Sequence, residues 1–308
     1  MSDLIVYNSE YVPPCIGFPN MGNTCYLNSL LQCLVSCSSF NYTIFSLQKN
    51  NMTTANVELS NNGARPNKIL INAFYYLIKS KLDALRVIHN CLIQQSHGRR
   101  DKIRMTHTGQ EDAQEGFLLL IEALNTPDID KLFTYRNAIA LVCQECKRET
   151  SRHEEENMIF SINPMFGTTS SDSSSTADIN DFLLNQKDIV TGHYCKFCKR
   201  NTTKCKYTML VMIPEILCVS LNKYFQKPNT ILPTTLKFKG NGTIEGKSFV
   251  YKIAAQSEHY GNMHGGHYRA IVRRCNGSFM CDDSSIYEHN MVPTQNTYMI
   301  FYHYVGME

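Results

Sequence analysis

The sequence predicts an α+β fold, because helical patterns fill the first part of the chain and short strand patterns fill the rest. Leu27, Leu30, Leu31 and Leu34 follow helical spacing. After about residue 135, runs that are rich in β-branched and aromatic residues replace that spacing. With 308 residues, of which 43% are hydrophobic, the chain can form one large domain or two of ordinary size.

Two more helices are predicted before this change. Residues 69–78 form one of them, and Pro127 ends the other, whose apolar face consists of Phe117, Leu120, Ile121 and Leu124. Residues 50–67 are predicted to be a loop. The predicted strands are residues 139–142, 209–213, 216–221, 249–253 and 298–304. The low-complexity segment 167–178 has nothing to bury, so we expect a flexible loop between two strands.

Charge and composition exclude several classes of partner. A net charge of +3 provides no strong field for nucleic acid or for an anionic membrane, so we expect neither. No apolar run is long enough to span a bilayer, and the first residues lack the pattern of a secretory signal. Thirteen cysteines, an odd number that includes two CxxC pairs, fit a reducing compartment. We therefore expect a cytoplasmic or nuclear protein.

The segment 17–26, GFPNMGNTCY, points to a reactive cysteine. Asn23 and Thr24 are good N-cap residues, so Cys25 is predicted to lie in the first turn of a helix. There, unpaired backbone N–H groups and the helix dipole favour the thiolate, which is the nucleophilic form. Asn20 offers a side-chain amide that can donate to an oxyanion. A cysteine in this position is more often a small buried residue, so the prediction requires a partner base.

His267 is the candidate base. Two glycines before it leave its ring open to a cleft, and a predicted strand follows. Asp282 lies where a neighbouring antiparallel strand can bring its carboxylate back to accept a hydrogen bond from the imidazole. His259 and His264 are close enough in sequence to be alternatives, and spacing alone does not separate the three histidines.

Four cysteines have the spacing of metal ligands. Cys143 and Cys146 form one CxxC pair, and Cys195 and Cys198 form the other. Two such knuckles close a tetrahedral zinc site without an open position, so we expect Zn²⁺ as a structural and not a catalytic ion. Coincidence among thirteen cysteines is the first alternative, which the basic residues beside both pairs disfavour. A redox CxxC is the second, but no thioredoxin-like context surrounds either pair.

Four motifs, taken in their order along the chain, resemble those of the ubiquitin-specific proteases. NMGNTCYLNSLLQCL resembles the cysteine box of that family, and HGGHYRAIV followed by FMCDDS resembles its histidine box. Between them, GQEDAQE at residues 109–115 resembles the acidic segment, and LNKYF at residues 221–225 resembles a characteristic strand. The resemblance extends from about residue 16 to about residue 304.

The resemblance implies a single catalytic domain over residues 1–308 with a papain-like fold. The helical thumb would span about residues 16–130, the zinc-bearing β fingers 131–215 with the flexible loop 167–178, and the β-rich palm 216–308 with the histidine box. It also implies a deubiquitinase that hydrolyses the (iso)peptide bond after the C-terminal glycine of ubiquitin through an acyl-thioester. Ubiquitin and ubiquitinated proteins would be its partners, and we expect a monomer.

Site residues follow from the matched motifs, position by position. Cys25 corresponds to the nucleophile, His267 to the general base and Asp282 to the acid of the triad. Asn20 corresponds to the residue that stabilises the oxyanion, and Asp283 to a second acid that assists it in some members. Because Asp282 and Asp283 are consecutive in a predicted strand, we expect their side chains to point to opposite faces.

The matched acidic segment is expected to border the channel for the tail of ubiquitin. Asp112 and Glu115 lie three positions apart on one helical face, which suits the arginines of that tail. Without the resemblance, acids that complement a helix dipole would be the preferred interpretation. Gly265 and Gly266 fit a channel that admits only a Gly-Gly end.

Three alternatives to a deubiquitinase are open. A protease for another ubiquitin-like modifier shares the diglycine chemistry, and the sequence does not distinguish it. A non-catalytic ubiquitin-binding module predicts loss of a triad residue, and all three candidates are present. A zinc-dependent nucleic-acid protein requires a basic face that a charge of +3 does not supply.

Overall fold

The computed structural model describes residues 11–53, 66–98, 104–162, 176–178, 188–221, 232–239, 248–262, 265–275 and 277–308. The predicted flexible loop 167–178 lies outside the described residues except for its last three, which form a short strand. His264 also lies outside them. Within the described chain, the helices come first and all the strands follow, so the predicted α+β class is confirmed.

Six helices make up the first half of the described chain: α1 (Cys25–Leu34), α2 (Ser38–Thr53), α3 (Lys68–Ile78), α4 (Ala84–His97), α5 (Ala113–Leu124) and α6 (Pro127–Phe133). The three predicted helices correspond to α1, α3 and α5, whereas α2, α4 and α6 were not predicted. Pro127 does not end a helix. It opens α6, where Thr126 caps the first turn, and Asn125 ends α5 in the left-handed region with φ 51°.

The predicted loop 50–67 is helical over residues 50–53, because α2 continues to Thr53, and its residues 54–65 lie outside the described residues. Its last residue, Asn67, caps α3, since the side chain accepts a hydrogen bond from the backbone N–H of Leu70 at 3.1 Å. Among the described residues, no single helix is long and apolar enough to cross a membrane. By length and composition alone, α1 and residues 38–50 pass that test as a pair bent by 87°.

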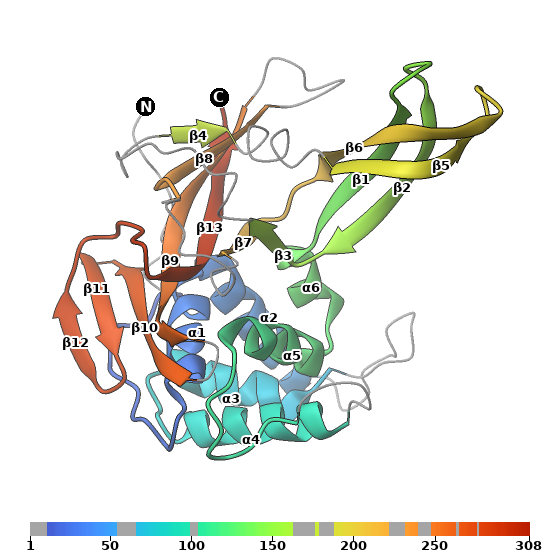
Figure 1. The fold of residues 1–308 in the computed structure, drawn as a ribbon. Coiled ribbons are helices and arrows are strands. Elements are labelled where there is room, and N and C mark those ends of the chain that lie inside the picture. The colour runs from blue at the N-terminus through green and yellow to red at the C-terminus, as the bar shows by residue number, and fades with distance from the viewer. Residues whose placement is uncertain are drawn as a thin grey trace.

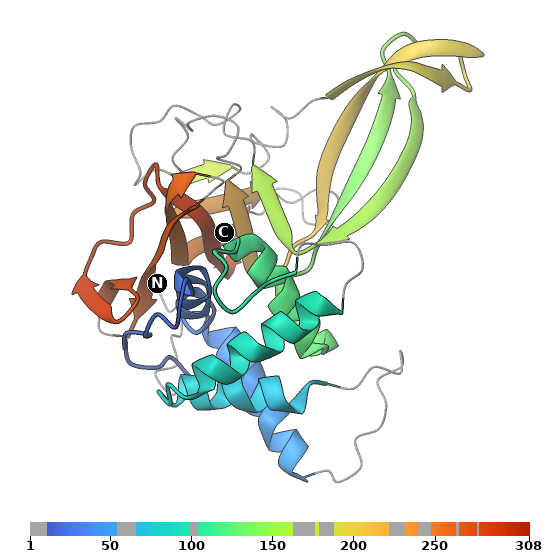
Figure 2. The same cartoon turned by 60° about the horizontal axis from the view of Figure 1, so that its bottom comes forward.

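A four-stranded antiparallel sheet forms an arm that projects away from the helices (Figures 1 and 2). Its strands, in the order β2-β1-β6-β5, are β1 (Tyr135–Cys143), β2 (Glu149–Asn157), β5 (Asp188–Cys195) and β6 (Arg200–Met212). The arm lies within the segment 131–215 that was predicted as fingers. That segment also contains β3 (Ile159–Ile162) and β4 (Thr176–Asp178), which belong to the other sheet.

The second sheet has nine strands and follows the path β12-β11-β10-β9-β13-β7-β3, with β8 paired to β9 and β4 paired to β8. Its other strands are β7 (Ile216–Leu221), β8 (Thr235–Lys239), β9 (Ser248–Asn262), β10 (Gly265–Arg274), β11 (Gly277–Asp282), β12 (Ser285–Glu288) and β13 (Thr297–Met307). Its pairs are antiparallel except β3 with β7 and β4 with β8. The predicted strand 216–221 coincides with β7.

Hydrophobic side chains pack on both faces of this sheet. Cys218 and Phe301 join the cluster that includes the helices, whereas their neighbours Leu217, Val219 and Ile300 join a second cluster. This alternation is the period of two that a strand imposes on its side chains. Every residue of α1 is buried, and the helix packs against β9, β10 and α5. The first turn of α1 is therefore fixed beside the strand that carries the candidate base.

Candidate active site

Cys25 is the first residue of α1, and Thr24 is its N-cap. The Thr24 side chain does not cap the helix as predicted, because its Oγ1 accepts a hydrogen bond from the N–H of Met21 at 2.9 Å. Asn23 adopts a left-handed φ of 53° and donates from its amide to the carbonyl of Thr108 at 2.7 Å. The turn before α1 is thus held by its own hydrogen bonds and by the segment that precedes α5.

The sulfur of Cys25 lies in a mostly buried position, with 5% of the residue exposed. Burial raises the pKa of the thiol, although hydrogen bonds from the N–H groups of Tyr268 and of the helix start lower it. The negative charge of Asp283 raises this pKa further. The N–H groups at the helix start therefore lower the pKa of Cys25, as predicted, but burial raises it by more. The protonated thiol is the favoured form in the free protein.

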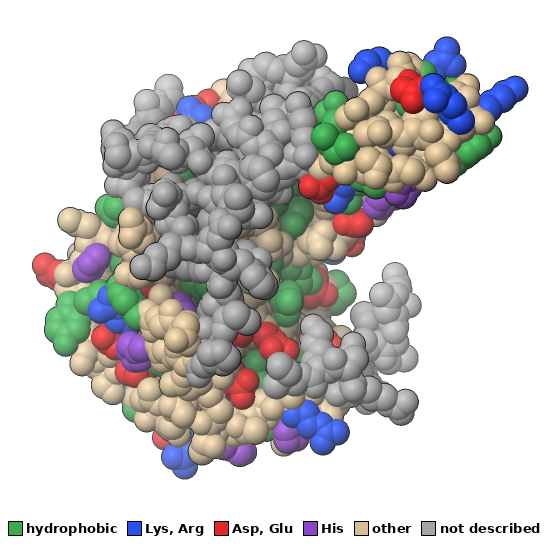
Figure 3. All heavy atoms as spheres, viewed as in Figure 1, with side chains coloured by type: hydrophobic (Ala, Val, Ile, Leu, Met, Phe, Trp, Pro, Cys, Tyr) green, Lys and Arg blue, Asp and Glu red, His purple; other side chains and the backbone are tan. Residues whose placement is uncertain are grey.

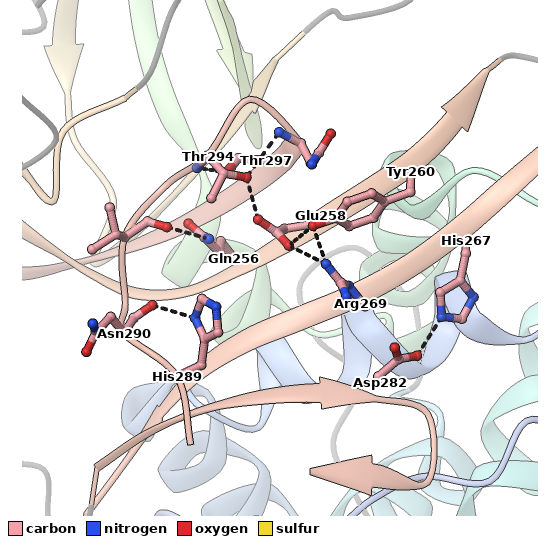
Figure 4. A network of polar contacts seen from close by, with 12 residues as sticks. Gln256, Glu258, Tyr260, His267, Arg269, Asp282, His289, Asn290, Thr294 and Thr297 are labelled. Carbon is pink, nitrogen blue, oxygen red and sulfur yellow. Dashed lines mark hydrogen bonds and ion pairs between the residues drawn. The ribbon is translucent and has the colours of Figure 1, made fainter. Parts of the chain in front are cut away.

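His267 and Asp282 form a hydrogen-bonded pair. The imidazole Nε2 lies 2.6 Å from the carboxylate Oδ1 (Figure 4). The two residues come from the adjacent antiparallel strands β10 and β11, which is the predicted arrangement. Their side chains are 42% and 33% exposed, so the pair faces solvent. The bond to Nε2 orients the ring and leaves Nδ1 as the nitrogen that can take up a proton.

Asp283 lies on the same side as Asp282, so the prediction that the two acids point to opposite faces is wrong. Carboxylate oxygens of both residues and a ring nitrogen of His267 lie within 4.8 Å of one another. β11 ends at Asp282, and Asp283 has a left-handed φ of 50° that turns the chain. Because strand alternation stops at this turn, the two side chains face the same place.

Asn20 is held by contacts at both ends of its side-chain amide. Its Oδ1 accepts hydrogen bonds from the N–H groups of Gly22 and Thr24 at 3.0 and 3.2 Å. Its Nδ2 donates to Asp283 Oδ2 at 2.9 Å. The amide nitrogen carries two hydrogens, so one remains for a group outside the protein.

Asn28 is a site residue that the sequence analysis missed. It is 3% exposed and donates from Nδ2 to Asp283 Oδ1 at 2.8 Å and to the carbonyl of Phe18 at 3.1 Å. Its position three residues after Cys25 places it on the same face of α1, which is the signal that was available. Two asparagines therefore hold the two carboxylate oxygens of Asp283.

Asp112 is engaged inside the protein. As the N-cap of α5, it accepts hydrogen bonds through Oδ1 from the N–H groups of Gln114 and Glu115 at 2.8 and 3.0 Å. Its Oδ2 accepts from the hydroxyls of Tyr298 and Tyr268. These contacts favour the alternative that this acid stabilises the helix start. Glu115 lies in the first turn and is half-buried.

Gly265 and Gly266 lie in tight contact with their surroundings. A Cβ on Gly266 would lie 2.4 Å from His259 Nε2 and 2.5 Å from the carbonyl oxygen of Tyr260, so the close approach of β9 requires glycine. The N–H of Gly266 donates to Gln110 Oε1 at 3.0 Å. A Cβ on Gly265 would lie 2.7 Å from the same oxygen. His259 thus packs against Gly266. The histidine that pairs with Asp282 is His267 and not His259.

A buried polar network supports the strand that carries His267 (Figure 4). Glu258 on β9 is 2% exposed and accepts hydrogen bonds from the hydroxyls of Tyr260 at 2.8 Å and of Thr294 at 2.5 Å. Arg269 lies two residues after His267 and contacts the same carboxylate at 3.5 Å. These contacts connect β9, β10 and the segment before β13. They lie close to the candidate base, because Arg269 and Tyr260 are its near neighbours in the β9–β10 pair.

A single family model matches residues 16–302, and its description is ubiquitin carboxyl-terminal hydrolase. The chain belongs to this family. The matched range includes the cysteine that starts α1, the histidine of β10 and the acids after β11. It confirms the family that the motifs of the sequence predicted.

Curated relatives are similar to this protein over most of the chain. "Ubiquitin carboxyl-terminal hydrolase 36" of Drosophila grimshawi is 25% identical over 321 residues, which cover 93% of this chain and 25% of that protein. "Ubiquitin carboxyl-terminal hydrolase 40" of Homo sapiens is 24% identical over 291 residues, which cover 83% of this chain and 22% of that protein. The chain spans about a quarter of the length of these relatives.

Solved structures show the fold of the chain. The structure titled "SAGA DUB module Ubp8(C146A)/Sgf11/Sus1/Sgf73 bound to monoubiquitin" matches with a TM-score of 0.74 at 16% identity. The match covers 97% of this chain and 71% of that chain. A second structure of that module, bound to ubiquitin aldehyde, matches with the same TM-score. The predicted fold, with helices, β-sheets and an arm that carries a cluster of four cysteines, is confirmed.

The far end of the arm carries the four cysteines of the two CxxC pairs. Their sulfurs lie within 4.8 Å of one another. Cys143 and Cys198 are 3.9 Å apart, and Cys146 and Cys195 are 3.8 Å apart. Around a tetrahedral ion with Zn–S bonds of about 2.3 Å, sulfurs are separated by roughly 3.8 Å. The spacing of the four thiols therefore fits zinc.

The two knuckles that hold these thiols have the same backbone conformation. Lys147 and Lys199, each directly after the second cysteine of its pair, are left-handed with φ 58° and 56°. Each donates its N–H to the carbonyl of the first cysteine of its pair, at 3.0 and 2.8 Å. Lysine and arginine side chains also gather at this end of the arm (Figure 3).

Replacing Asp112 with alanine should lower the free energy of unfolding of the protein by about 2 kcal/mol. The change removes a helix cap and the carboxylate oxygen that accepts hydrogen bonds from two tyrosine hydroxyls. Glu115→Ala is the matched control in the same turn, and it should cost less than about 0.5 kcal/mol. Urea denaturation of both variants measures the difference. Equal losses would show that the contacts of Asp112 contribute nothing specific.

Replacing Asp283 with asparagine should lower the pKa of the Cys25 thiol. The carboxylate raises that pKa, so its removal favours the thiolate and moves the midpoint of alkylation to lower pH. Asparagine tolerates the left-handed turn at this position, which keeps the backbone intact. The rate of Cys25 alkylation by iodoacetamide, followed against pH, measures the shift. Asp188→Asn on the arm is the control, and a midpoint unchanged in both variants contradicts the assignment.

Proposed function

We propose that the chain is a deubiquitinase that hydrolyses the peptide or isopeptide bond after the C-terminal glycine of ubiquitin. The observation that carries this proposal is the 2.6 Å pair of His267 and Asp282 on strands against which the Cys25 end of α1 is packed. Membership of the family supports the reaction, and the neighbouring structures bound to ubiquitin support the substrate.

Proton transfer starts the reaction. His267 Nδ1 takes the proton from the thiol of Cys25, and the resulting thiolate attacks the carbonyl carbon of the terminal glycine. Because the pKa of the thiol is raised in the free protein, the proton moves when the substrate is in place. Asp282 stabilises the imidazolium and keeps the ring in the orientation that exposes Nδ1.

The tetrahedral intermediate places a negative charge on the former carbonyl oxygen. The free N–H of the Asn20 amide and the N–H groups at the start of α1 donate to that oxygen. Asp283 holds the Asn20 amide in place through the 2.9 Å hydrogen bond. His267 then protonates the departing amine, which leaves ubiquitin attached to Cys25 as a thioester. Water hydrolyses the thioester with His267 again acting as the base.

The tail of the substrate enters between α5 and the start of β10. Gly265 and Gly266 present backbone there without side chains, and Glu115 is the acid of this region that remains for an arginine of the tail. Gln110 contacts the N–H of Gly266 at 3.0 Å in the free protein, so a bound tail competes with that contact. Asp112 shapes this region indirectly, because it fixes the first turn of α5.

We also propose that Cys143, Cys146, Cys195 and Cys198 bind one structural zinc ion. The matched knuckles and the sulfur spacing of 3.8 to 3.9 Å support this assignment. Four thiolates leave no position for a substrate or for water, so the ion stabilises the end of the arm and takes no part in the reaction.

Cys25→Ala should reduce the turnover of ubiquitin that carries a C-terminal fluorogenic amide by about 10⁴ to 10⁶, because the attacking sulfur is lost. Asp282→Ala should reduce kcat by about 10² to 10⁴, because it removes only the group that orients the base. Cys91→Ala on α4 is the control and should keep full activity. Activity of Cys25→Ala close to that of the control would disprove the role of this cysteine.

A labelling experiment on the unmodified protein separates ubiquitin from related modifiers. Ubiquitin and several ubiquitin-like proteins, each with a C-terminal electrophile, are mixed with the chain in turn. Covalent attachment to Cys25 is expected with ubiquitin. Attachment of a different modifier alone would reassign the substrate, and attachment of none would favour a non-catalytic binding protein.

Cys143→Ser should abolish zinc binding and lower the thermal stability of the arm. Elemental analysis should find one zinc ion per wild-type chain and none in the variant, since a closed site needs all four thiolates. Cys205→Ser on β6, close to but outside the cluster, is the matched control and should retain the ion. A folded and active wild-type sample without zinc contradicts the assignment.

A further inference from the structure

Cys15 and Cys281 lie side by side although 266 positions separate them in the sequence. Their sulfurs are 3.5 Å apart. Cys15 belongs to the segment that leads to the cysteine box and is half-buried. Cys281 is the residue of β11 directly before Asp282, and it is 3% exposed. The pair thus consists of one thiol that small molecules can reach and one that is buried beside the active site.

A buried positive charge lies next to this pair. Arg274 is 4% exposed, and its guanidinium donates to Gln32 Oε1 at 2.8 Å and to the hydroxyl of Ser36. Its Nε has no hydrogen-bond partner among the described residues. The acidic groups whose charge acts on it are the thiols of Cys15, Cys281, Cys33 and Cys37. A buried cation is costly without an anion, so the cluster favours one thiolate.

Cys15 is the thiol that ionises. The hydrogen bond from Cys281 lowers the pKa of Cys15 to about 7, and the charge of Arg274 contributes, although burial opposes both. The same hydrogen bond, together with burial, raises the pKa of Cys281. Cys15 is therefore the more acidic sulfur of the pair. Burial raises the pKa of the catalytic thiol Cys25, which makes it the less reactive sulfur in the free protein.

We propose that Cys15 and Cys281 form a peroxide-reactive dithiol that becomes a disulfide before Cys25 is oxidised. The sulfur of Cys15 attacks one oxygen of a hydroperoxide, the O–O bond breaks, and the departing oxygen leaves as water or an alcohol after protonation. The sulfur of Cys281 then attacks the sulfenic sulfur of Cys15. The S–O bond breaks, and the departing hydroxide takes the Cys281 proton to form water. Two thiols are oxidised, and one peroxide is reduced.

The disulfide acts on the turn that carries the acids of the site. An S–S bond is about 2.05 Å long, so the two sulfurs must approach each other by about 1.5 Å. The surrounding backbone has little room, because a Cβ on Gly17 would already lie 2.1 Å from the carbonyl oxygen of Ser284. Closing the bond therefore displaces Asp282 relative to His267, and we expect turnover to fall. This last step rests on the proposed deubiquitinase function.

Treatment of the reduced 308-residue chain with an equimolar amount of hydrogen peroxide at neutral pH tests the proposal. After free thiols are blocked and the protein is digested, mass spectrometry should find the peptides of Cys15 and Cys281 linked. The peptide that contains Cys25 should carry the blocking group, which shows that this thiol was not oxidised. The kcat of the oxidised protein should fall several-fold and return after dithiothreitol.

Two variants make the result specific. Cys15→Ser should form no link to Cys281 and should keep its kcat under the same treatment, whereas Cys275→Ser, which removes an exposed cysteine nearby, should behave as wild type. Oxidation of Cys25 ahead of the pair, or linked protein with unchanged kcat, would overturn the proposal. Mass spectrometry detects the Cys15–Cys281 link whether or not the protein is active. A reduced protein without activity would therefore refute the proposed function, whereas the linkage would still test the dithiol.

Discussion

The contact between the segment before α1 and the turn after β11 is the constraint on which the candidate site depends. The N–H of Phe18 donates to the carbonyl of Asp283 at 2.8 Å, and the side chain of the same aspartate is held by Asn20 and Asn28. These groups are more than 250 positions apart in the sequence. Closing so long a loop costs entropy, which the packing of α1 against β9 and β10 offsets. This contact therefore fixes the segment before Cys25 relative to the acids at the end of β11.

Asp283 has two opposing effects on the chemistry. Its carboxylate holds the Asn20 amide, to which we assign the oxyanion role in the proposed reaction, and its charge raises the pKa of the Cys25 thiol. The second effect favours the protonated thiol, which is less reactive toward electrophiles than the thiolate. At Cys15 the balance is reversed, because a hydrogen bond and a buried guanidinium outweigh desolvation. The pKa of one thiol is lowered and that of the other is raised within the same region, because different local contacts dominate at each.

The sequence predicted the elements whose residues show a clear period, such as α1, α3 and β7, together with the residues that carry the family motifs. It missed β2, because every residue of that strand is polar and no alternation marks a buried face. It placed Asp282 and Asp283 on opposite faces, because no local sequence pattern indicates that the strand ends between them. Asn28 and Arg274 were also missed. Their roles come from partners far away in sequence, and local patterns do not contain that information.

The polar composition of β2 also affects how molecules of this protein can associate. β2 is an edge strand of the arm, so one side of its backbone presents N–H and C=O groups that a strand from another molecule can pair with. Its side chains include Glu149, Glu154, Glu155 and Glu156, and the whole strand is largely exposed. Arg136, Arg152 and His153 lie within ion-pair distance of these carboxylates, so charges of both signs line the strand. Charged side chains of this kind make an exposed edge a poor template for continuous pairing between copies of the arm.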